Sequence, residues 1–293
     1  DEILAEATAG YWPSPRMLGI YNWVGSWPLK LGTIFMLLSS PDSAKVIYLA
    51  GIKHQTDRAL RVLYNYRFRP WRLLWALGDA FFLNSANAIS VRFRGRFVMM
   101  AAMHILRDLA HTNGHLKLEG ASLGSGSAPW VLKAAAANGL GSAEVRFALV
   151  DKSLEALETG KVNAGRMGIA GAVTTHQMTI GEYLSGQATG WAHLVEMVGL
   201  TDYIKEGPLQ GYLEEIHRIM IPGGSHLGAN ISSGVEKRFA HSAALWPRMI
   251  YRKREEVIAM LLKAGFKKDN IWTGMCGLYV VWVARKGEKE SDS

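Results

Sequence analysis

The sequence is poor in cysteine: Cys276 is the single one among 293 residues. One cysteine cannot form an intramolecular disulfide, and this scarcity is typical of proteins in a reducing compartment. Because Cys276 lies in an apolar segment near the C-terminus, we expect a buried structural thiol and not a nucleophile. The sequence also has no repeat and no low-complexity tract, so an ordinary globular fold is expected.

Long apolar runs are missing as well. The most apolar early window, residues 29–52, is broken by Ser39, Pro41 and Lys45. A membrane span needs about 20 continuous apolar residues, and this window falls short of that length. No signal peptide is apparent. The sequence therefore predicts a cytoplasmic protein without a membrane span.

Acidic residues are fewer than basic ones. The chain carries 33 Lys and Arg against 25 Asp and Glu, a net charge of +8, and residues 1–115 hold 13 of the basic and 7 of the acidic residues. A basic surface suits nucleic acid, anionic lipid or an acidic substrate, although a solvated helical surface has the same composition. Charge alone leaves these interpretations open.

The pattern of the chain changes after about residue 110. Residues 1–87 show helical spacing of apolar residues between Pro- and Ser-containing turns, and a further helix is predicted at 88–110. From residue 115 strands and helices alternate, which is typical of a parallel sheet with helices on both faces. The last two strands predict an antiparallel hairpin. Strands are expected at 115–119, 144–150, 168–174, 191–199, 224–230, 270–275 and 278–284, and helices at 128–138, 152–160, 208–221 and 251–265.

The most informative stretch is residues 116–127. An apolar strand runs there into small residues that include Gly124 and Gly126, and a helix follows at once. Small residues let a ligand lie against the backbone, and a helix N-terminus offers unpaired N–H groups. Residues 144–150 predict a second strand that ends at Asp151, whose carboxylate suits two ribose hydroxyls. Together these features indicate a nucleoside-containing cofactor.

With three later segments, this pattern resembles the class I S-adenosylmethionine-dependent methyltransferases over about residues 88–285. The segments are the turn Gly199-Leu200-Thr201-Asp202-Tyr203, the sequence Pro222-Gly223-Gly224 after a helix, and Ala264-Gly265-Phe266 before the final hairpin. The turn is typical of a branch of small-molecule methyltransferases. The resemblance implies a Rossmann-like, seven-stranded, mostly parallel sheet. It also implies a helical region at 1–87 and a cofactor-binding domain at 88–293, with S-adenosylmethionine as cofactor and S-adenosylhomocysteine as product.

The resemblance also implies a set of cofactor contacts. Asp151 is expected on the ribose, Arg94 on the methionine carboxylate, and Gln177 with Met178 on the adenine. The family places an acid two residues before the first of three glycines, whereas this chain has Gly120 there, with Glu119 one residue away. We expect a bulge to bring Glu119 to the methionine amino group; otherwise that contact is lost. The full set is Arg94, Glu119, Gly120, Ala121, Gly124, Gly126, Asp151, Lys152, Gln177, Met178, Gly199 and Leu200.

Residues for the acceptor are predicted from the same resemblance. His176, His193 and His241 are candidate general bases because imidazole titrates near neutral pH, and Tyr203 is expected to face the transferred methyl group. No metal site is expected. The N-terminal aromatic residues predict a lid, a dimer contact or ordinary core packing. Substrate contacts are expected from Tyr21, Asp202, Tyr203, Trp246, Arg248 and Tyr251.

The sequence thus predicts methyl transfer to a small organic acceptor, apolar and with an acidic group. Methylation of RNA is an alternative because the chain is basic, although no RNA-binding module is recognisable. A scaffold that binds the cofactor without turnover is a second alternative. A nicotinamide-dependent oxidoreductase fits less well, since Pro129 stands where the third glycine of its fingerprint belongs. A homodimer is expected if the N-terminal region is a contact between subunits.

Overall fold

The computed structural model describes residues 1–53, 55–72, 74–111, 117–137 and 144–288. Seven strands form one sheet in the order β3-β2-β1-β4-β5-β7-β6. The first five run parallel, and β7 is antiparallel to both of its neighbours. The strands are β1 (Lys117–Leu123), β2 (Glu144–Asp151), β3 (Val173–Gln177), β4 (Ala192–Val198), β5 (Met220–Ile231), β6 (Ile271–Cys276) and β7 (Tyr279–Arg285).

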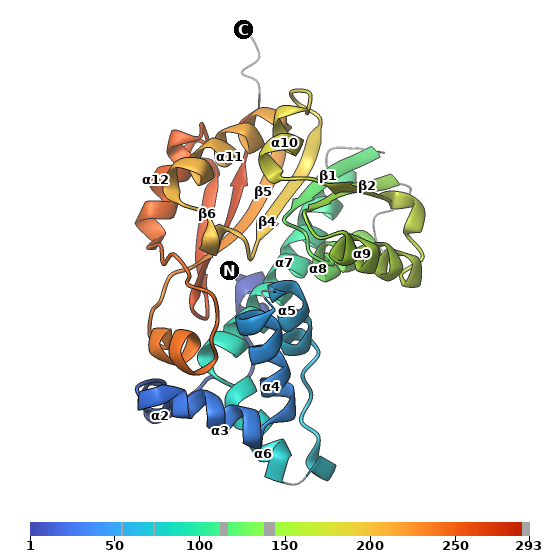
Figure 1. Cartoon of the computed structure of the whole chain (residues 1–293). Coiled ribbons are helices and arrows are strands. Elements are labelled where there is room, and N and C mark those ends of the chain that lie inside the picture. The colour runs from blue at the N-terminus through green and yellow to red at the C-terminus, as the bar shows by residue number, and fades with distance from the viewer. Residues whose placement is uncertain (54, 73, 112–116, 138–143, 289–293) are drawn as a thin grey trace, which may run out of the picture.

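Helices cover both faces of this sheet (Figure 1). One face packs against α10 (Ile180–Ser185), α11 (Glu206–Ile219) and α12 (Arg254–Lys263). The other face packs against α7 (Ala86–His111), α8 (Pro129–Ala135) and α9 (Leu154–Arg166). Local sequence starts several of these helices: Ser153 caps α9, Pro129 occupies the first position of α8, and Thr179 with Glu182 forms a capping box on α10.

The N-terminal helices gather at one end of the molecule, drawn at the bottom of Figure 1. The helices at this end are α2 (Pro15–Gly25), α3 (Leu31–Ser39), α4 (Pro41–Ile47), α5 (Thr56–Tyr64) and α6 (Leu74–Leu83), whereas α1 (Glu2–Ala7) packs beside α7 and β6. Residues 232–253, which follow β5, join them and include a π-helical turn at Phe239–Ala243. One hydrophobic cluster contains Leu49 and Leu63 of this region together with Leu118 and Leu227 of the sheet. The predicted N-terminal region therefore shares a core with the sheet.

The predicted fold class is confirmed, with its seven strands, its C-terminal hairpin and its N-terminal helices. Several predicted boundaries are wrong, and β5 begins at Met220 and not at residue 224. β1 continues through Gly120 and Ala121 to Leu123, because small residues fit where β1 lies between β2 and β4. Helix α9 continues to Arg166, and β3 begins only at Val173, since Gly168 has a positive φ of 76° and a 3₁₀ turn follows it. Among the described helices, none combines the length and the apolar character of a membrane span.

Candidate functional site

The loop after β1 is folded tightly against the end of β2. The backbone N–H groups of Gly124 and Ser125 both donate to the carbonyl oxygen of Val150, at 2.8 and 3.0 Å. Gly124, Gly126 and Ala128 have positive φ angles of 66°, 52° and 45°. Only glycine adopts this conformation without strain, so Ala128 is held in it by its surroundings. The loop therefore has one defined shape.

Asp151, at the end of β2, joins this loop to helix α9. One carboxylate oxygen accepts the N–H of Gly126 at 2.8 Å, and the other accepts the N–H of Ser153 at 2.9 Å. Each oxygen keeps a further lone pair for a ligand hydroxyl. The carboxylate predicted to hold a ribose thus also shapes the loop beside it.

A cleft of about 300 Å³ lies over the carboxyl ends of β1, β2 and β4. In open α/β sheets this edge is where ligands bind. Residues from the predicted N-terminal region also line it, since α5 passes over the loop. The lining includes Asp57, Arg61, Tyr64, Arg94, Gly124, Gly126, Asp151, Lys152, Glu196, Gly199, Leu200 and Tyr203.

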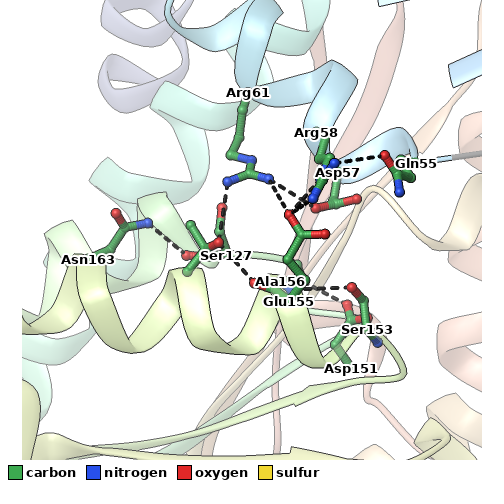
Figure 2. A network of polar contacts seen from close by, with 12 residues as sticks. Gln55, Asp57, Arg58, Arg61, Ser127, Asp151, Ser153, Glu155, Ala156 and Asn163 are labelled. Carbon is green, nitrogen blue, oxygen red and sulfur yellow. Dashed lines mark hydrogen bonds and ion pairs between the residues drawn. The ribbon is translucent and has the colours of Figure 1, made fainter. Parts of the chain in front are cut away.

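Helix α5 is fastened to helix α9 by polar side chains (Figure 2). The Nε atom of Arg58 donates to Glu155 at 2.6 Å, and Arg61 donates to Thr159 at 3.3 Å. Arg61 also lies 3.6 Å from Asp57 in the same helix. We call these side chains the α5–α9 contact. It places α5 over the cleft, so that a helix of the N-terminal region forms a wall of the site.

Two buried charged side chains face the cleft from below. The Glu196 carboxyl of β4 accepts a hydrogen bond from the Ser122 hydroxyl of β1, and burial raises its pKa to about 7. Arg94 of α7 is 2% exposed, stacks over the Tyr279 ring at 4.4 Å, and lies 3.4 Å from Asp202. Its Nε atom has no hydrogen-bond partner among the described residues. Buried polar atoms of this kind are uncommon, and a ligand is one way to satisfy them.

The turn at residues 199–203, which is part of the resemblance to methyltransferases, has a structural role. Asp202 is buried, and its carboxylate accepts the N–H of Ile231 at 2.6 Å. Arg252 donates to the carbonyl oxygen of Thr201 at 2.9 Å and to the side chain of Asn230 at 2.7 Å. These bonds fix the turn to the end of β5, so that Leu200 and Tyr203 reach the cleft. Asp202 itself lies beneath the cleft and not in its wall.

An apolar cavity of about 60 Å³ lies between α7, the N-terminal helices and residues 239–249. Trp246 lines it, and the indole N–H of Trp246 donates to the hydroxyl of Tyr203 at 2.8 Å. Tyr279, which stacks on Arg94, also lines the cavity. Tyr203 and Arg94 therefore stand between this cavity and the cleft.

A second, basic pocket lies on the outer side of the same segment. Its lining includes Lys237, Arg238, His241 and Arg248, and Met249 lines both this pocket and the apolar cavity. His241 contacts the carbonyl oxygen of Trp246 at 3.1 Å, and its other ring nitrogen lies 3.4 Å from the Tyr251 hydroxyl.

Several predicted residues lie away from the cleft. Glu119 sits four residues before the end of β1, about 13 Å along the strand, and forms an ion pair with Lys117 at 2.9 Å. The expected bulge is wrong, because β1 and β2 pair in unbroken register from Lys117 to Leu123. Gly120 and Ala121 are enclosed within β1. Gln177 and Met178 follow β3 beside Asp151 but outside the lining of the cleft.

The remaining candidates divide between packing and the outer pockets. The ring of His176 packs against Tyr183 of α10, and His193 accepts the backbone N–H of Glu119 at 3.2 Å. Tyr21 is in the core, where its hydroxyl donates to the carbonyl oxygen of Phe81 at 2.6 Å. Tyr251 lines a separate pocket beside Glu206 and α12. No group of three or more metal-ligating side chains occurs in the described ranges.

Glu196 and the α5 residues were not predicted from the sequence. Glu196 is a lone acid in the apolar strand 194–198, a pattern that signals a functional carboxyl or a buried pair. Asp57, Arg61 and Tyr64 are spaced i, i+4 and i+7, which places them on one helix face. The sequence shows that these three residues share a helix face, but it does not show which surface this face packs against.

No family model and no curated protein matches the chain. Solved structures do. A possible exported protein from Bordetella parapertussis is similar with a TM-score of 0.65 at 14% identity, over 98% of this chain and 96% of that one. Magnesium protoporphyrin IX methyltransferase from Synechocystis PCC 6803, with bound S-adenosylhomocysteine, has a TM-score of 0.53 at 12% identity, over 84% and 100% of the two chains.

An O-methyltransferase family protein from Burkholderia thailandensis has a TM-score of 0.51 at 11% identity, over 85% of this chain and 72% of that one. At such identities the likeness concerns the fold. The chain shares its Rossmann-like fold with these methyltransferase structures.

Proposed function

We propose that this protein transfers a methyl group from S-adenosylmethionine to a small organic acceptor. The observation that carries the proposal is the cleft itself. It combines a glycine loop of defined shape with a strand-end carboxylate, Asp151, at the edge of the sheet where ligands bind in this architecture. The methyltransferase fold agrees with it.

The residues of the cleft fit such a cofactor. A Cβ atom added at Gly126 would meet only the Asp57 side chain within 4 Å, at 3.6 Å, in the described part of the chain. The backbone of Gly126 is thus open to a ligand, and Asp151 beside it would accept the two ribose hydroxyls. Arg94 would bind the methionine carboxylate through its Nε atom, which has no hydrogen-bond partner among the described residues.

The bound cofactor supplies a methyl group already activated by its sulfonium. The chain therefore has to align the acceptor and exclude water. Burial raises the pKa of Tyr203 well above its usual value, so Tyr203 serves as a hydrogen-bonding group and not as a base at neutral pH. With Trp246 it forms the wall between the cleft and the apolar cavity.

The acceptor would be apolar with an anionic group. The cavity beside Tyr203 is lined mainly by apolar side chains, and the pocket on the far side of Met249 is basic. An acceptor that spans Met249 would place its apolar part against Tyr203 and Trp246, which would have to move aside for the acceptor atom to reach the cofactor, and its anionic group near Arg248. His241, in the same basic pocket, is the histidine among the three candidates that lies nearest this path.

Two measurements test the proposal. Titration calorimetry should show binding of S-adenosylhomocysteine and none of NADH. Labelled S-adenosylmethionine should then transfer its methyl group to members of a panel of apolar carboxylic acids more readily than to their neutral amides or to RNA. Failure of the folded protein to bind S-adenosylhomocysteine would contradict the proposed function.

Single substitutions distinguish the proposed acceptor pocket from the cofactor cleft. Arg248→Ala should raise KM for the acidic acceptor several-fold while leaving cofactor affinity unchanged. Arg67→Ala, an exposed arginine outside the pockets described above, is the matched control. Equal effects of the two substitutions would contradict the anionic part of the proposal.

A further inference from the structure

We propose that Glu196 replaces the acid missing from the glycine-loop motif and binds the ammonium group of the cofactor's amino-acid end. This inference rests on the function proposed above. It concerns a residue on a different strand from the loop, at a position where the motif itself predicts no ligand.

The structure leaves no room for an acid at the position where the motif places one. A Cβ atom at Gly120 would lie 2.5 Å from the carbonyl oxygen of Leu194 and 2.6 Å from the Phe147 ring. The first of these is a backbone atom of the neighbouring strand, which cannot shift without breaking the pairing of β1 and β4. Gly120 is therefore required by packing, and a carboxylate must come from elsewhere.

Glu196 is placed to supply it. β1 and β4 are parallel neighbours, and Glu196 pairs with Ser122, two residues beyond Gly120 toward the cleft. The carboxyl is held by two neutral donors, the hydroxyl of Ser122 and the backbone N–H of Val198. A carboxylate accepts about four hydrogen bonds, so capacity remains for a further donor. Because Glu196 lines the cleft, its remaining lone pairs accept hydrogen bonds from the ammonium group of the cofactor.

Arg94 supplies the opposite charge in the same wall. Its guanidinium lies next to Gly199, where a Cβ atom would be 3.1 Å from Nη2, and its Nε atom lacks a partner among the described residues. An amino acid carries an ammonium and a carboxylate on the same carbon atom. A buried carboxyl and a buried guanidinium on one cleft are the matching pair of charges.

Protonation of Glu196 couples this contact to pH. Burial raises the pKa of Glu196 to about 7, whereas Ser122, Val198 and Arg94 lower it. The protonated carboxyl cannot hold a cation, so binding of the ammonium must release a proton at pH 6 and little at pH 8. The other titratable or charged groups that line the cleft are Asp57, Arg61 and Tyr64 from α5, Asp151 and Lys152 after β2, and Tyr203.

The test compares two ligands and three proteins by titration calorimetry. S-adenosylhomocysteine carries the amino-acid end, and 5′-methylthioadenosine lacks it. For the wild type we expect affinity for S-adenosylhomocysteine to rise about tenfold from pH 6 to pH 8. Glu196→Gln should lose that rise and bind S-adenosylhomocysteine at least tenfold more weakly at pH 8. Its affinity for 5′-methylthioadenosine should be unchanged, which also shows that the variant is folded.

Glu119→Gln is the matched control, because Glu119 is the acid nearest to the motif position in sequence. It should behave as the wild type at both pH values. If Glu196→Gln binds 5′-methylthioadenosine and still binds S-adenosylhomocysteine like the wild type, the inference is overturned and the proposed function stands. If wild type binds neither ligand, the proposed function fails and the inference fails with it.

Discussion

At the scale of single residues, Asp151 has two tasks in one side chain. Its carboxylate holds Gly126 and Ser153 through backbone N–H groups, and it presents remaining lone pairs to the cleft. Such charge-assisted bonds are stronger than neutral ones. The residue therefore organises the loop itself as well as any ligand on it.

We expect Asp151→Ala to weaken S-adenosylhomocysteine binding by about 1–3 kcal/mol, because both the ligand contact and the support of the loop are lost. Asp151→Asn keeps one acceptor oxygen and should lose less. Calorimetry with both variants measures the difference, and thermal melting shows that each is folded. Wild-type affinity in folded Asp151→Ala would remove this residue from the site.

Glu196 differs from Asp151, because its ionised carboxylate lowers the stability of the folded protein. Burial raises the pKa of its carboxyl from 4.5 to about 7 in the folded chain. As pH rises through this window, the unfolded chain loses its proton first, so folding becomes less favourable. A buried carboxyl that lowers stability at neutral pH is typical of a functional position.

The second prediction follows from this loss of stability as pH rises. Between pH 4.5 and pH 7 the wild type should lose up to roughly 3 kcal/mol of stability that Glu196→Gln keeps. The difference in Tm between variant and wild type should therefore move by several degrees in favour of the variant from pH 5 to pH 8. His226, whose pKa burial lowers to about 4, has the opposite effect but is common to both proteins. A constant difference in Tm would contradict the assignment.

At the scale of elements, the α5–α9 contact decides whether the cleft is covered. Arg58 and Glu155 are each more than a third exposed, so their ion pair contributes at most about 1 kcal/mol to stability. The ion pair matters through its position, because α5 forms one wall of the cleft and is one of the N-terminal helices.

We therefore expect Arg58→Ala to leave Tm nearly unchanged and to speed dissociation of S-adenosylhomocysteine several-fold. Because exposed ion pairs are screened by salt, high ionic strength should speed dissociation from the wild type and affect the variant less. Arg146→Ala removes a comparably exposed pair with Glu144 on β2 and is the control. Stopped-flow dissociation rates that are equal in all three proteins would refute this role.

At the scale of the whole molecule, the first 28 residues contribute several side chains to the core. Tyr21 and Val24 pack with Phe82 and Phe239, and Leu4 lies beside Gly274 of β6. Of the three roles predicted for the N-terminal aromatic residues, core packing is the one in which the structure places Tyr21.

Deletion of residues 1–28 should therefore lower Tm by more than about 10 °C, because it uncovers apolar surface on two sides of the protein. Tyr21→Phe is the mild counterpart: it loses one buried hydrogen bond to Phe81 and about 1 kcal/mol. Thermal melting monitored by circular dichroism measures both. A deletion variant with the wild-type Tm would show that the segment is a detachable lid.

The same end of the molecule exposes large apolar side chains. Leu38 of α3 is 77% exposed, and Trp23 of α2 and Leu77 of α6 are each 61% exposed. These helices lie together in Figure 1. Large exposed apolar side chains gathered at one end of a protein are typical of surfaces that contact other proteins or membranes.

We propose a homodimer through this surface, since a contact between subunits was one of the three roles that the sequence left open for the N-terminal region. Leu38→Glu together with Leu77→Glu should shift the protein from dimer to monomer in light scattering, with little change in Tm. Leu262→Glu, on the exposed side of α12, is the control and should stay dimeric. A monomeric wild type, or wild-type binding to lipid vesicles that the double variant loses, would contradict this expectation.

The sequence by itself determined the sheet, its C-terminal hairpin, the helix at α7 and the place of Asp151. These follow from local patterns: apolar periodicity, Gly and Pro at turns, and an acid directly after an apolar strand. Such signals lie within about a dozen residues, so they can be read without knowing what packs against them.

The tertiary structure decided which acid faces the cleft and which helix covers it. Glu119 and Glu196 are both acids in predicted strands. Pairing of β1 with β4 joins residues 74 positions apart and brings Glu196, not Glu119, to the carboxyl end. Likewise α5 reaches the loop only through its packing on α7 and α9. Strand register and helix docking depend on contacts distant in sequence, and no local pattern records them.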